Sequence, residues 1–345
     1  MLVTYVRSSS YNNYDFCQMQ YFLTYVLGWR SDSGKKADMG TMAHKVMEIL
    51  AGLKKFQQDN PRKKYLVIDD DKCGKLRVHK DELYTDGFVD EMTELAIKKY
   101  AEDSKHKFYR GDRKAIRDTV QTFLTHSDGL FDPRLRDIYY PEAQFDIPIE
   151  EDWAKFEYEI NGEIVKGQLA IKGTIDLTTL VSEDTIEVID WKTGRRMDWA
   201  TGEVKDYKKL ENDAQLLLYF YAISKIYPQY KNKIMSIFFY KDKDGEVDPR
   251  PFSICFDESD EKRFLEKLKA RFEEIKQNKN PKPLDPTRTN FKCKYLCHFC
   301  KNKFEGKDEN MCITIEKALK KDGMEKVIEG YTAPGFNIGF YEAPG

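Results

Sequence analysis

Two charged residues stand inside an apolar segment of the sequence, the stretch VIDWKTG at residues 188–194. Asp190 and Lys192 are two residues apart, so their side chains would lie on the same face of a β-strand. Burying two charges on one face is costly unless they pair or serve a chemical function. For this spacing alone, a structural ion pair at a sheet edge is the simpler interpretation.

Asp176 lies in a second apolar stretch, GTIDL, fourteen residues before Asp190. A short connection between two strands would bring Asp176, Asp190 and Lys192 together at one end of a sheet. Two carboxylates suit a hard divalent cation such as Mg2+ or Mn2+. Such a cation would polarise a phosphodiester and lower the pKa of a bound water, while the lysine balances charge developing on phosphate.

Two predicted helices contribute further candidates. The stretch GTMAHKVMEIL places His44 four residues after Gly40, on a helix at about 41–56. A strongly apolar helix at about 208–227 carries Gln215 and Tyr219 one turn apart, and hence on one face. Taken singly, a helical histidine is more often structural, and a tyrosine often lies at a core boundary with its hydroxyl wet. Neither helix identifies a site by itself.

The seven cysteines indicate metal or redox chemistry, because the N-terminus lacks the apolar core of a secretory leader. Cys17 lies on a predicted N-terminal helix, and Cys73 and Cys255 have no partner in the sequence, Cys255 being expected in the core. The other cysteines group near the C-terminus and would suit a local Zn2+ site: Cys293, Cys297, Cys300 and Cys312.

Hydrophobic periodicity predicts the elements that must position these residues. Helices come first, around a charged, irregular segment at 60–78: about 11–28, 41–56, 80–102 and 111–127. Strands follow from about 140 to 191, and again at 233–241 and 251–256 after the apolar helix. An amphipathic helix at about 261–278 precedes the cysteine group, and a tail with one short helix spans 313–345. This order predicts an α/β fold with a mixed central β-sheet flanked by helices.

The composition, with 34% charged and 41% hydrophobic residues, fits a soluble globular protein. Its formal charge is −2, so any basic surface for nucleic acid must be local. No run approaches the roughly 18 apolar residues of a membrane helix, which predicts a cytoplasmic protein without a membrane partner. Several basic residues cluster in the sequence near the candidate motifs: Lys35, Lys36, Lys45, Arg195, Arg196, Lys208 and Lys209. They could form a local track for the phosphates of nucleic acid, or be simply a solvated face.

In combination, these motifs resemble the RecB-like branch of the PD-(D/E)XK nucleases. The family's four motifs occur here in the family's order, within about residues 8–312: Gly40-x-x-x-His44, Gly173-Thr-Ile-Asp176, Glu187-Val-Ile-Asp190-Trp-Lys192-Thr-Gly194 and Gln215-x-x-x-Tyr219. The first acid stands in TID rather than PD, and the second is Asp rather than Glu.

The resemblance implies a PD-(D/E)XK, restriction-endonuclease-like core and assigns roles to its residues. Lys192 would be the catalytic lysine, and Gln215 and Tyr219 would brace the site and contact the DNA backbone. The ligands of Mg2+ or Mn2+ would be His44, Asp176, Asp190 and the main-chain carbonyl of Trp191.

One subset of these nucleases carries a 4Fe-4S cluster, namely the AddB-type recombination nucleases and the CRISPR-adaptation nucleases. In that subset, a cysteine in an N-terminal stretch similar to SSSYNNYDFC joins three C-terminal cysteines. The resemblance therefore implies the cluster ligands Cys17, Cys297, Cys300 and Cys312. The spacing from Cys300 to Cys312 is longer than is usual in the family, and Cys293 is an additional thiol. The local Zn2+ site, with Cys17 left out, stays an alternative.

The sequence thus predicts a metal-dependent DNase, an exonuclease on DNA ends or single-stranded DNA, that hydrolyses phosphodiesters by a metal-activated water. The alternatives are a catalytically silent subunit that binds DNA ends with the same fold, and a Zn-stapled structure-specific endonuclease. Without a Walker A motif, any ATP-driven motion would come from a helicase or recombination partner. The sequence leaves oligomerisation undecided.

The predicted organisation is one nuclease domain at 1–312 followed by the tail at 313–345. Within it we expect a helical insertion at about 57–138 and a catalytic sheet core at about 139–257. A Cys-cluster region at 290–312 would close onto the N-terminal helix.

Overall fold

The computed structural model describes residues 1–31, 33–160, 162–198, 202–247 and 251–336, without the side chains of residues 160 and 163. The chain divides into two compact units, each assembled from separate stretches. The first, named the sheet unit here, comprises Ser33–Gln144 and Thr174–Asp257. The second, the cysteine unit, comprises Met1–Asp32, Phe145–Gly173 and Glu258–Gly345.

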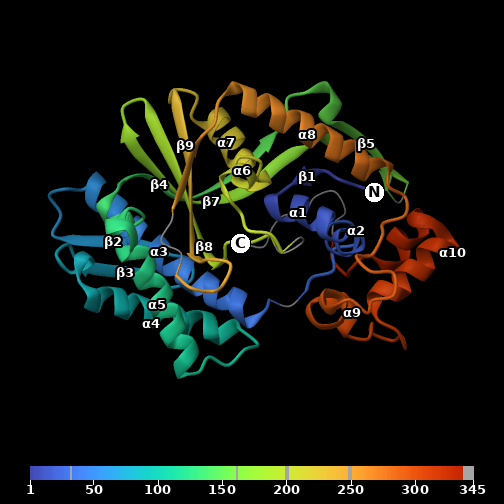
Figure 1. The fold of residues 1–345 in the computed structure, drawn as a ribbon, viewed down its shortest axis with the longest axis horizontal. Helices are drawn as coiled ribbons and strands as arrows, with labels where there is room; N and C mark the ends of the chain where they lie inside the picture. Colours follow the sequence, from blue (N-terminus) through green and yellow to red (C-terminus); the bar gives the residue numbers. More distant parts are fainter. Residues whose placement is uncertain (32, 161, 199–201, 248–250, 337–345) are drawn as a thin grey trace. The chain divides into compact units, whose positions relative to one another are not determined.

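A mixed β-sheet forms the centre of the sheet unit, as predicted (Figure 1). Strand β7 pairs antiparallel with β8, β8 parallel with β9, and β9 antiparallel with β10, while β4 pairs with β7. A parallel pair needs a crossover connection, and α6 (Tyr207–Leu210) and α7 (Ala214–Ile226) lie in it. The strands are β4 (Asp137–Pro148), β7 (Ala170–Ser182), β8 (Thr185–Arg195), β9 (Asn232–Lys241) and β10 (Phe252–Cys255).

Strand β8 serves two layers, because successive residues of a strand face opposite sides of the sheet. Trp191 belongs to the apolar core that includes Met42 and Phe123, from two helices on that side. Asp190 instead faces α7, where Gln215 donates a hydrogen bond to it. The helices of the core side, which appear in Figure 1 beside the sheet, are α3 (Lys35–Asp59), α4 (Asp86–Asp103) and α5 (Arg110–Thr125).

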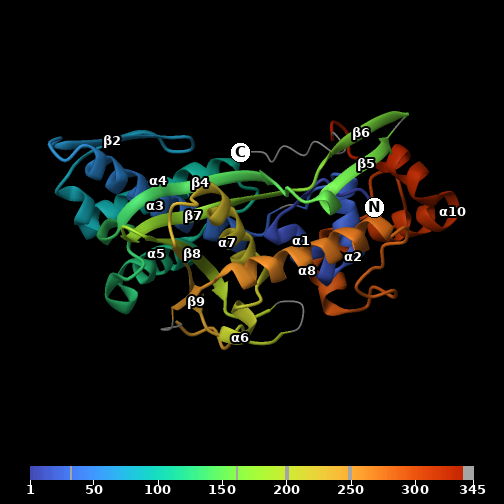
Figure 2. The same cartoon turned by 90° about the horizontal axis from the view of Figure 1, so that it is seen from above.

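Two predictions for the sheet unit are wrong in detail. The segment 60–78 is not irregular, since β2 (Tyr65–Asp70) and β3 (Gly74–His79) form an antiparallel hairpin beside α3 (Figure 2). The helix predicted at 208–227 is two helices, because the Asp213 carboxylate caps α7 by accepting the backbone N–H of Gln215. Short 3₁₀ turns complete the unit: η2 (Glu82–Tyr84), η3 (His126–Gly129) and η4 (Pro133–Leu135).

The cysteine unit combines helices with short strands. β1 (Tyr5–Val6) pairs parallel with the first residues of β7, and β5 (Lys155–Ile160) pairs with β6 (Glu163–Gln168). The predicted amphipathic helix is α8 (Glu258–Gln277), which buries Phe264, Leu268, Phe272 and Ile275. The other elements are α1 (Ser8–Phe16), α2 (Gln18–Tyr21), the π-helical η1 (Phe22–Val26) and η6 (Lys292–Leu296), the 3₁₀ turn η5 (Asp152–Ala154), α9 (His298–Lys301) and α10 (Met311–Tyr331).

Two helix boundaries of this unit also differ from prediction. The helix expected at 11–28 is interrupted at Cys17, whose backbone is extended and whose Sγ accepts the N–H of Gln20 at the start of α2. The helix predicted as short in the tail is longer, because α10 spans Met311–Tyr331 with a kink at Gly323 and carries Cys312 in its first turn. Asn310 caps α10 by accepting the N–H of Ile313.

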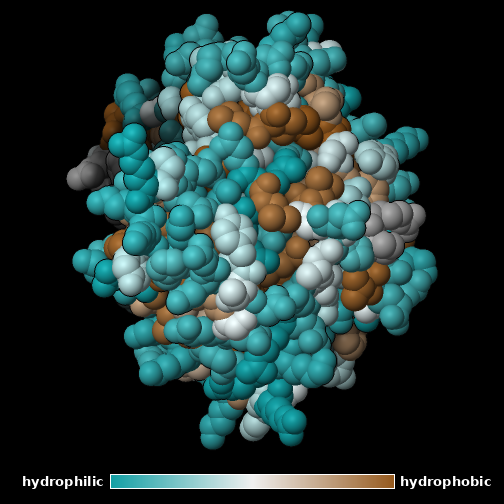
Figure 3. Space-filling model, turned by 90° about the vertical axis from the view of Figure 1, so that its left-hand side faces the viewer, coloured by the Kyte–Doolittle hydropathy of each residue, from teal (hydrophilic) through white to brown (hydrophobic). Residues whose placement is uncertain are grey.

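The surface is strongly polar, as the 34% of charged residues requires. Figure 3 shows one face on which hydrophilic side chains predominate and apolar groups gather in separate patches. Among the described helices, none is long and apolar enough to cross a membrane.

Candidate active site and cysteine pocket

The two aspartates lie where β7 and β8 stop pairing. The paired residues run from Ser182 opposite Thr185 to Leu177 opposite Ile189, with a bulge near Leu180. The next residue of each strand is an aspartate, Asp176 in β7 and Asp190 in β8. Asp176 Oδ2 accepts the backbone N–H of Trp191 at 2.9 Å in place of a strand–strand hydrogen bond. Each of the two carboxylates therefore stands at the end of this ladder.

Asp190 is only 1% exposed, and its two oxygens have different surroundings. Oδ1 accepts hydrogen bonds from Lys192 Nζ and from Gln215 Nε2, each at 3.0 Å. Oδ2 makes no well-aligned hydrogen bond with the part of the chain that the structure describes, but it forms an ion pair with the Lys192 ammonium at 2.7 Å. An oxygen that contacts one ammonium and no other donor keeps a lone pair that a cation could bind.

Helix α7 braces this arrangement. Its capped N-terminus fixes Gln215, and one turn later Tyr219 Oη lies 2.7 Å from Gln215 Nε2. The same hydroxyl donates to the main-chain oxygen of Thr174 at 2.8 Å and lies 3.5 Å from Asp190 Oδ1. Gln215 and Tyr219 thus join α7 to β7 and β8 and hold the Asp190 carboxylate in place.

Helix α3 brings His44 to the same place, with Nδ1 3.4 Å from Asp176 Oδ2. Gly40, one turn earlier, explains this close approach, because a Cβ at that position would lie 2.7 Å from the Thr193 hydroxyl oxygen of β8. The glycine of the Gly40-x-x-x-His44 motif therefore makes room for β8, and its histidine faces the Asp176 carboxylate.

Burial and mutual attraction set the protonation of these four groups. Burial raises the pKa of Asp190 to about 6, and the Lys192 ammonium only partly counteracts it. Burial would also raise the pKa of Asp176, but His44 and the other donors outweigh it and lower that pKa. Burial lowers the pKa of His44 and of Lys192, and the neighbouring carboxylates more than reverse both shifts.

Asp176, Asp190 and His44 are of the residue types that bind a hard divalent cation, but their ligand atoms, unlike those of Glu48, Asp70 and Asp71, do not all lie within 4.8 Å of one another. Asp176 and Asp190 offer oxygen ligands, and His44 offers a ring nitrogen. The N–H and C=O of one strand residue point to the same side. Since the Trp191 N–H points at Asp176, its carbonyl is expected on the same side of the strand, and its role as a metal ligand stays a prediction.

A second acidic group exists that the sequence reasoning missed. Glu48, Asp70 and Asp71 offer oxygens within 4.8 Å of one another, but the ammonium of Lys45 lies 2.5–3.2 Å from all three. Lys45 is 6% exposed and so cannot belong to a phosphate track, and that prediction is wrong for this residue. No sequence motif marks the group, because it joins a helix to a hairpin that periodicity does not predict.

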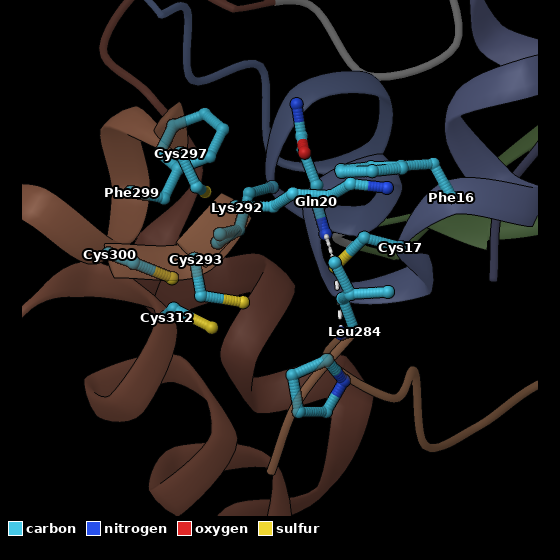
Figure 4. A pocket seen from close by; sticks show the side chains of 12 residues that line it. Phe16, Cys17, Gln20, Leu284, Lys292, Cys293, Cys297, Phe299, Cys300 and Cys312 are labelled. Atoms are coloured by element: carbon cyan, nitrogen blue, oxygen red, sulfur yellow. Dashed lines mark hydrogen bonds between the residues drawn. The ribbon is translucent and has the colours of Figure 1, made fainter. Parts of the chain in front are cut away.

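Five cysteines line one pocket of the cysteine unit (Figure 4), and all their thiols are free. Cys17 enters from the break between α1 and α2, where its Sγ accepts the N–H groups of Gln20 and Leu284 at 3.4 and 3.3 Å. The others come from η6, the α9 region and α10: Cys293, Cys297, Cys300 and Cys312. The pocket therefore holds both predicted ligand sets, and Cys255, expected in the core, is instead exposed.

The thiols of the pocket differ in acidity. Burial raises the pKa of Cys17 to about 11. The hydrogen bond from Cys300 lowers the pKa of Cys297 to about 7 and also lowers that of Cys312, which lies 3.6 Å from the Arg288 guanidinium. Donors thus favour the thiolate form at two of the cysteines, and thiolates are the form that binds metals.

Fold and site together define a metal-dependent nuclease. The sequence matches the family model of the PD-(D/E)XK nuclease superfamily over residues 8–303, and the chain belongs to this superfamily.

Among solved structures, the chain is similar to a protein of Eubacterium rectale provisionally assigned as an exonuclease. Identity is 13% and the TM-score 0.41, over 90% of this chain and 92% of that chain. It is also similar to the protein SSO0001, at 14% identity and a TM-score of 0.22, over 82% of this chain and 89% of that chain. No curated protein matches the chain.

The affinity of the protein for Mn2+ should rise with pH between about 5 and 8. A bound cation needs ionised Asp190, whose pKa is raised to about 6, so a proton competes with the metal below that pH. We expect affinity to fall about tenfold per pH unit there, measured by calorimetric titration without DNA.

Asp71→Asn is the matched control, because it removes an acid of the other group and should leave the titration unchanged. Asp190→Asn should abolish binding. A pH-independent affinity, or binding lost in Asp71→Asn, would place the cation elsewhere.

Proposed function

We propose that this protein hydrolyses the phosphodiester bonds of DNA and acts as an exonuclease on DNA ends or single strands. The supporting observation is the group formed at the end of the β7–β8 ladder, with Asp190 Oδ2 buried and paired with the Lys192 ammonium. When bound by Asp176, Asp190, His44 and the Trp191 carbonyl, Mg2+ or Mn2+ would polarise the phosphodiester and lower the pKa of a water molecule.

The chain's own residues would divide the remaining work. The Lys192 ammonium, 32% exposed at its side chain, can reach a phosphate oxygen while it stays beside Asp190. There it would stabilise the negative charge that develops as water attacks phosphorus and the leaving oxygen departs. Gln215 and Tyr219 would keep the Asp190 carboxylate in one orientation, so that the attack geometry needs no rearrangement.

A catalytically silent subunit that binds DNA ends is the alternative of a different class. Such a subunit would need the fold, but it would not need the side chains of His44, Asp176, Asp190 and Lys192 to lie within hydrogen-bonding or ion-pairing distance of one another. Here His44 reaches Asp176 and Lys192 reaches Asp190, so the geometry favours the enzyme. Working on DNA in the cytoplasm, the enzyme would rely on a helicase or recombination partner for ATP-driven motion.

Replacing Lys192 should separate catalysis from metal binding. We expect Lys192→Ala to cleave end-labelled DNA about 10²–10³-fold more slowly while still binding Mn2+. Asp190→Asn should lose both DNA cleavage and Mn2+ binding. Lys114→Ala, the control at an exposed lysine, should keep both. A metal-loaded wild-type protein that leaves double- and single-stranded DNA uncut would leave only the binding subunit.

We also propose that the cysteine pocket holds a 4Fe-4S cluster bound by Cys17, Cys297, Cys300 and Cys312. A zinc ion with sulfurs at 2.3 Å in a tetrahedron would set them about 3.8 Å apart. Among the described residues, no three cysteine sulfurs lie within 4.8 Å of one another. As they stand, the sulfurs are not gathered at the spacing of a single ion, while Cys300 hydrogen-bonds to both Cys297 and Cys312. The two N–H donors at Cys17 support its inclusion in the ligand set.

Such a cluster would join α2 to α9 and α10 and act as a staple within the cysteine unit, closing the predicted nuclease domain at 1–312. The alternative is a local Zn2+ site at Cys293, Cys297, Cys300 and Cys312, as in the Zn-stapled endonuclease interpretation.

Two serine variants distinguish the metals. Anaerobically purified protein should contain about four irons per chain and absorb in the blue region. Cys17→Ser should lose the iron, whereas Cys293→Ser should retain it, as metal analysis and absorption spectra would show. Zinc without iron, lost in Cys293→Ser and kept in Cys17→Ser, would identify the alternative.

A further inference from the structure

The segment 291–303, FKCKYLCHFCKNK, has a second face that the cysteine pocket does not use. Its cysteines line the pocket, with Cys293 buried (Figure 4). Three large apolar side chains of the same segment lie at the surface: Phe291 is 65% exposed, Tyr295 52% and Leu296 62%. Neighbouring exposed apolar side chains of this size are typical of a surface that binds a ligand or another macromolecule.

The two aromatic rings of this face lie side by side. Phe291 precedes the π-helical turn η6 and Tyr295 lies near its end, with ring centroids 5.2 Å apart and planes inclined by 43°. Lys294 Nζ is 5.2 Å from the centre of the Tyr295 ring. Exposed aromatic rings are surfaces on which the bases of a single strand stack, whatever their sequence.

The charge of the segment is one-sided. Residues 291–303 include four lysines and no Asp or Glu, in a chain whose formal charge is −2. Three of them are exposed and make no ion pair with any residue that the structure describes: Lys294, Lys301 and Lys303. Lys317, by contrast, is paired with Glu309. Positive charge that the protein leaves uncompensated is complementary to phosphate.

The combination of aromatic rings and lysines favours nucleic acid over protein as the partner of this surface. Protein–protein interfaces are enriched in aromatic residues but depleted of lysine. Surfaces that bind single-stranded nucleic acid combine aromatic rings with positive charge along the backbone path. The segment 291–303 has both features within thirteen residues.

We propose that this face is a platform for single-stranded DNA. Bases would stack on Phe291 and Tyr295, and phosphates would contact Lys294, Lys301 and Lys303. The inference rests on the proposed nuclease function and deepens it, because it names single-stranded DNA as the substrate that the cysteine unit holds.

Removal of both rings tests the stacking. The protein is purified with the metal of its cysteine pocket in place, and Mg2+ and Mn2+ are left out so that DNA is not cut. Fluorescence anisotropy then measures binding of labelled oligothymidylate and oligodeoxyadenylate. Phe291→Ala with Tyr295→Ala should weaken both about tenfold or more. The exchange Phe291→Tyr with Tyr295→Phe keeps the rings and should keep the affinity. Tyr140→Ala is the matched control, because Tyr140 is 53% exposed in the sheet unit.

The dependence of affinity on salt tests the phosphate contacts. Each contact to a single strand contributes about 0.7 to the slope of log affinity against log salt. Replacing Lys294, Lys301 and Lys303 together by Gln should therefore lower the slope by about 2. The same change at three exposed lysines of the sheet unit should leave the slope unchanged: Lys63, Lys64 and Lys98.

A small phosphodiester substrate distinguishes a failure of the proposed nuclease activity from a failure of the proposed DNA platform. Bis(p-nitrophenyl) phosphate has no chain of bases to stack, so the double alanine variant should cleave it at the wild-type rate. A wild type that binds oligonucleotides through these residues but cleaves neither substrate would refute the nuclease and leave the platform standing. Unchanged oligonucleotide affinity in the ring and lysine variants would overturn the platform. If those variants also lost self-association in sedimentation, the surface would be a protein interface.

Discussion

The candidate active site depends on keeping one carboxylate, that of Asp190, inside the protein. Burial raises its pKa, and the Lys192 ammonium limits the rise to about 6, so that the group is still mainly ionised at neutral pH. Lys192 and Gln215 donate to one of its oxygens, and the other is paired with the Lys192 ammonium alone, at 2.7 Å. A carboxylate held in this way is an incomplete coordination shell. The crossover helix α7, the end of the β7–β8 ladder and the close approach of α3 all contribute to that arrangement.

The sequence draws attention to the centre of the candidate site because the relevant signals are local. Asp190 and Lys192 interrupt an apolar strand with the period of two that puts them on one face, and Asp176 lies one strand away. His44 and the Gln215–Tyr219 pair carry no such signal. Only their order in the chain, through the resemblance to a nuclease family, identifies them. The structure adds the reason for Gly40, whose missing side chain makes room for Thr193.

What the sequence does not predict depends on contacts between distant segments or on local capping. Lys45 looks like a surface charge on its helix, yet a hairpin brings Asp70 and Asp71 against it. Cys17 interrupts a pattern that periodicity reads as one helix, because its sulfur replaces a side-chain oxygen as a cap. In the cysteine unit, one short segment presents thiols to a pocket and aromatic rings to solvent.

The location of a bound cation tests the account most directly. Anomalous diffraction from crystals grown with Mn2+ would locate the metal independently of any activity. The account predicts a Mn2+ ion bound by Asp176 and Asp190, with His44 as a nitrogen ligand and Lys192 beside it. Mn2+ found instead at Glu48, Asp70 and Asp71, with the Asp190–Lys192 pair unchanged, would contradict it.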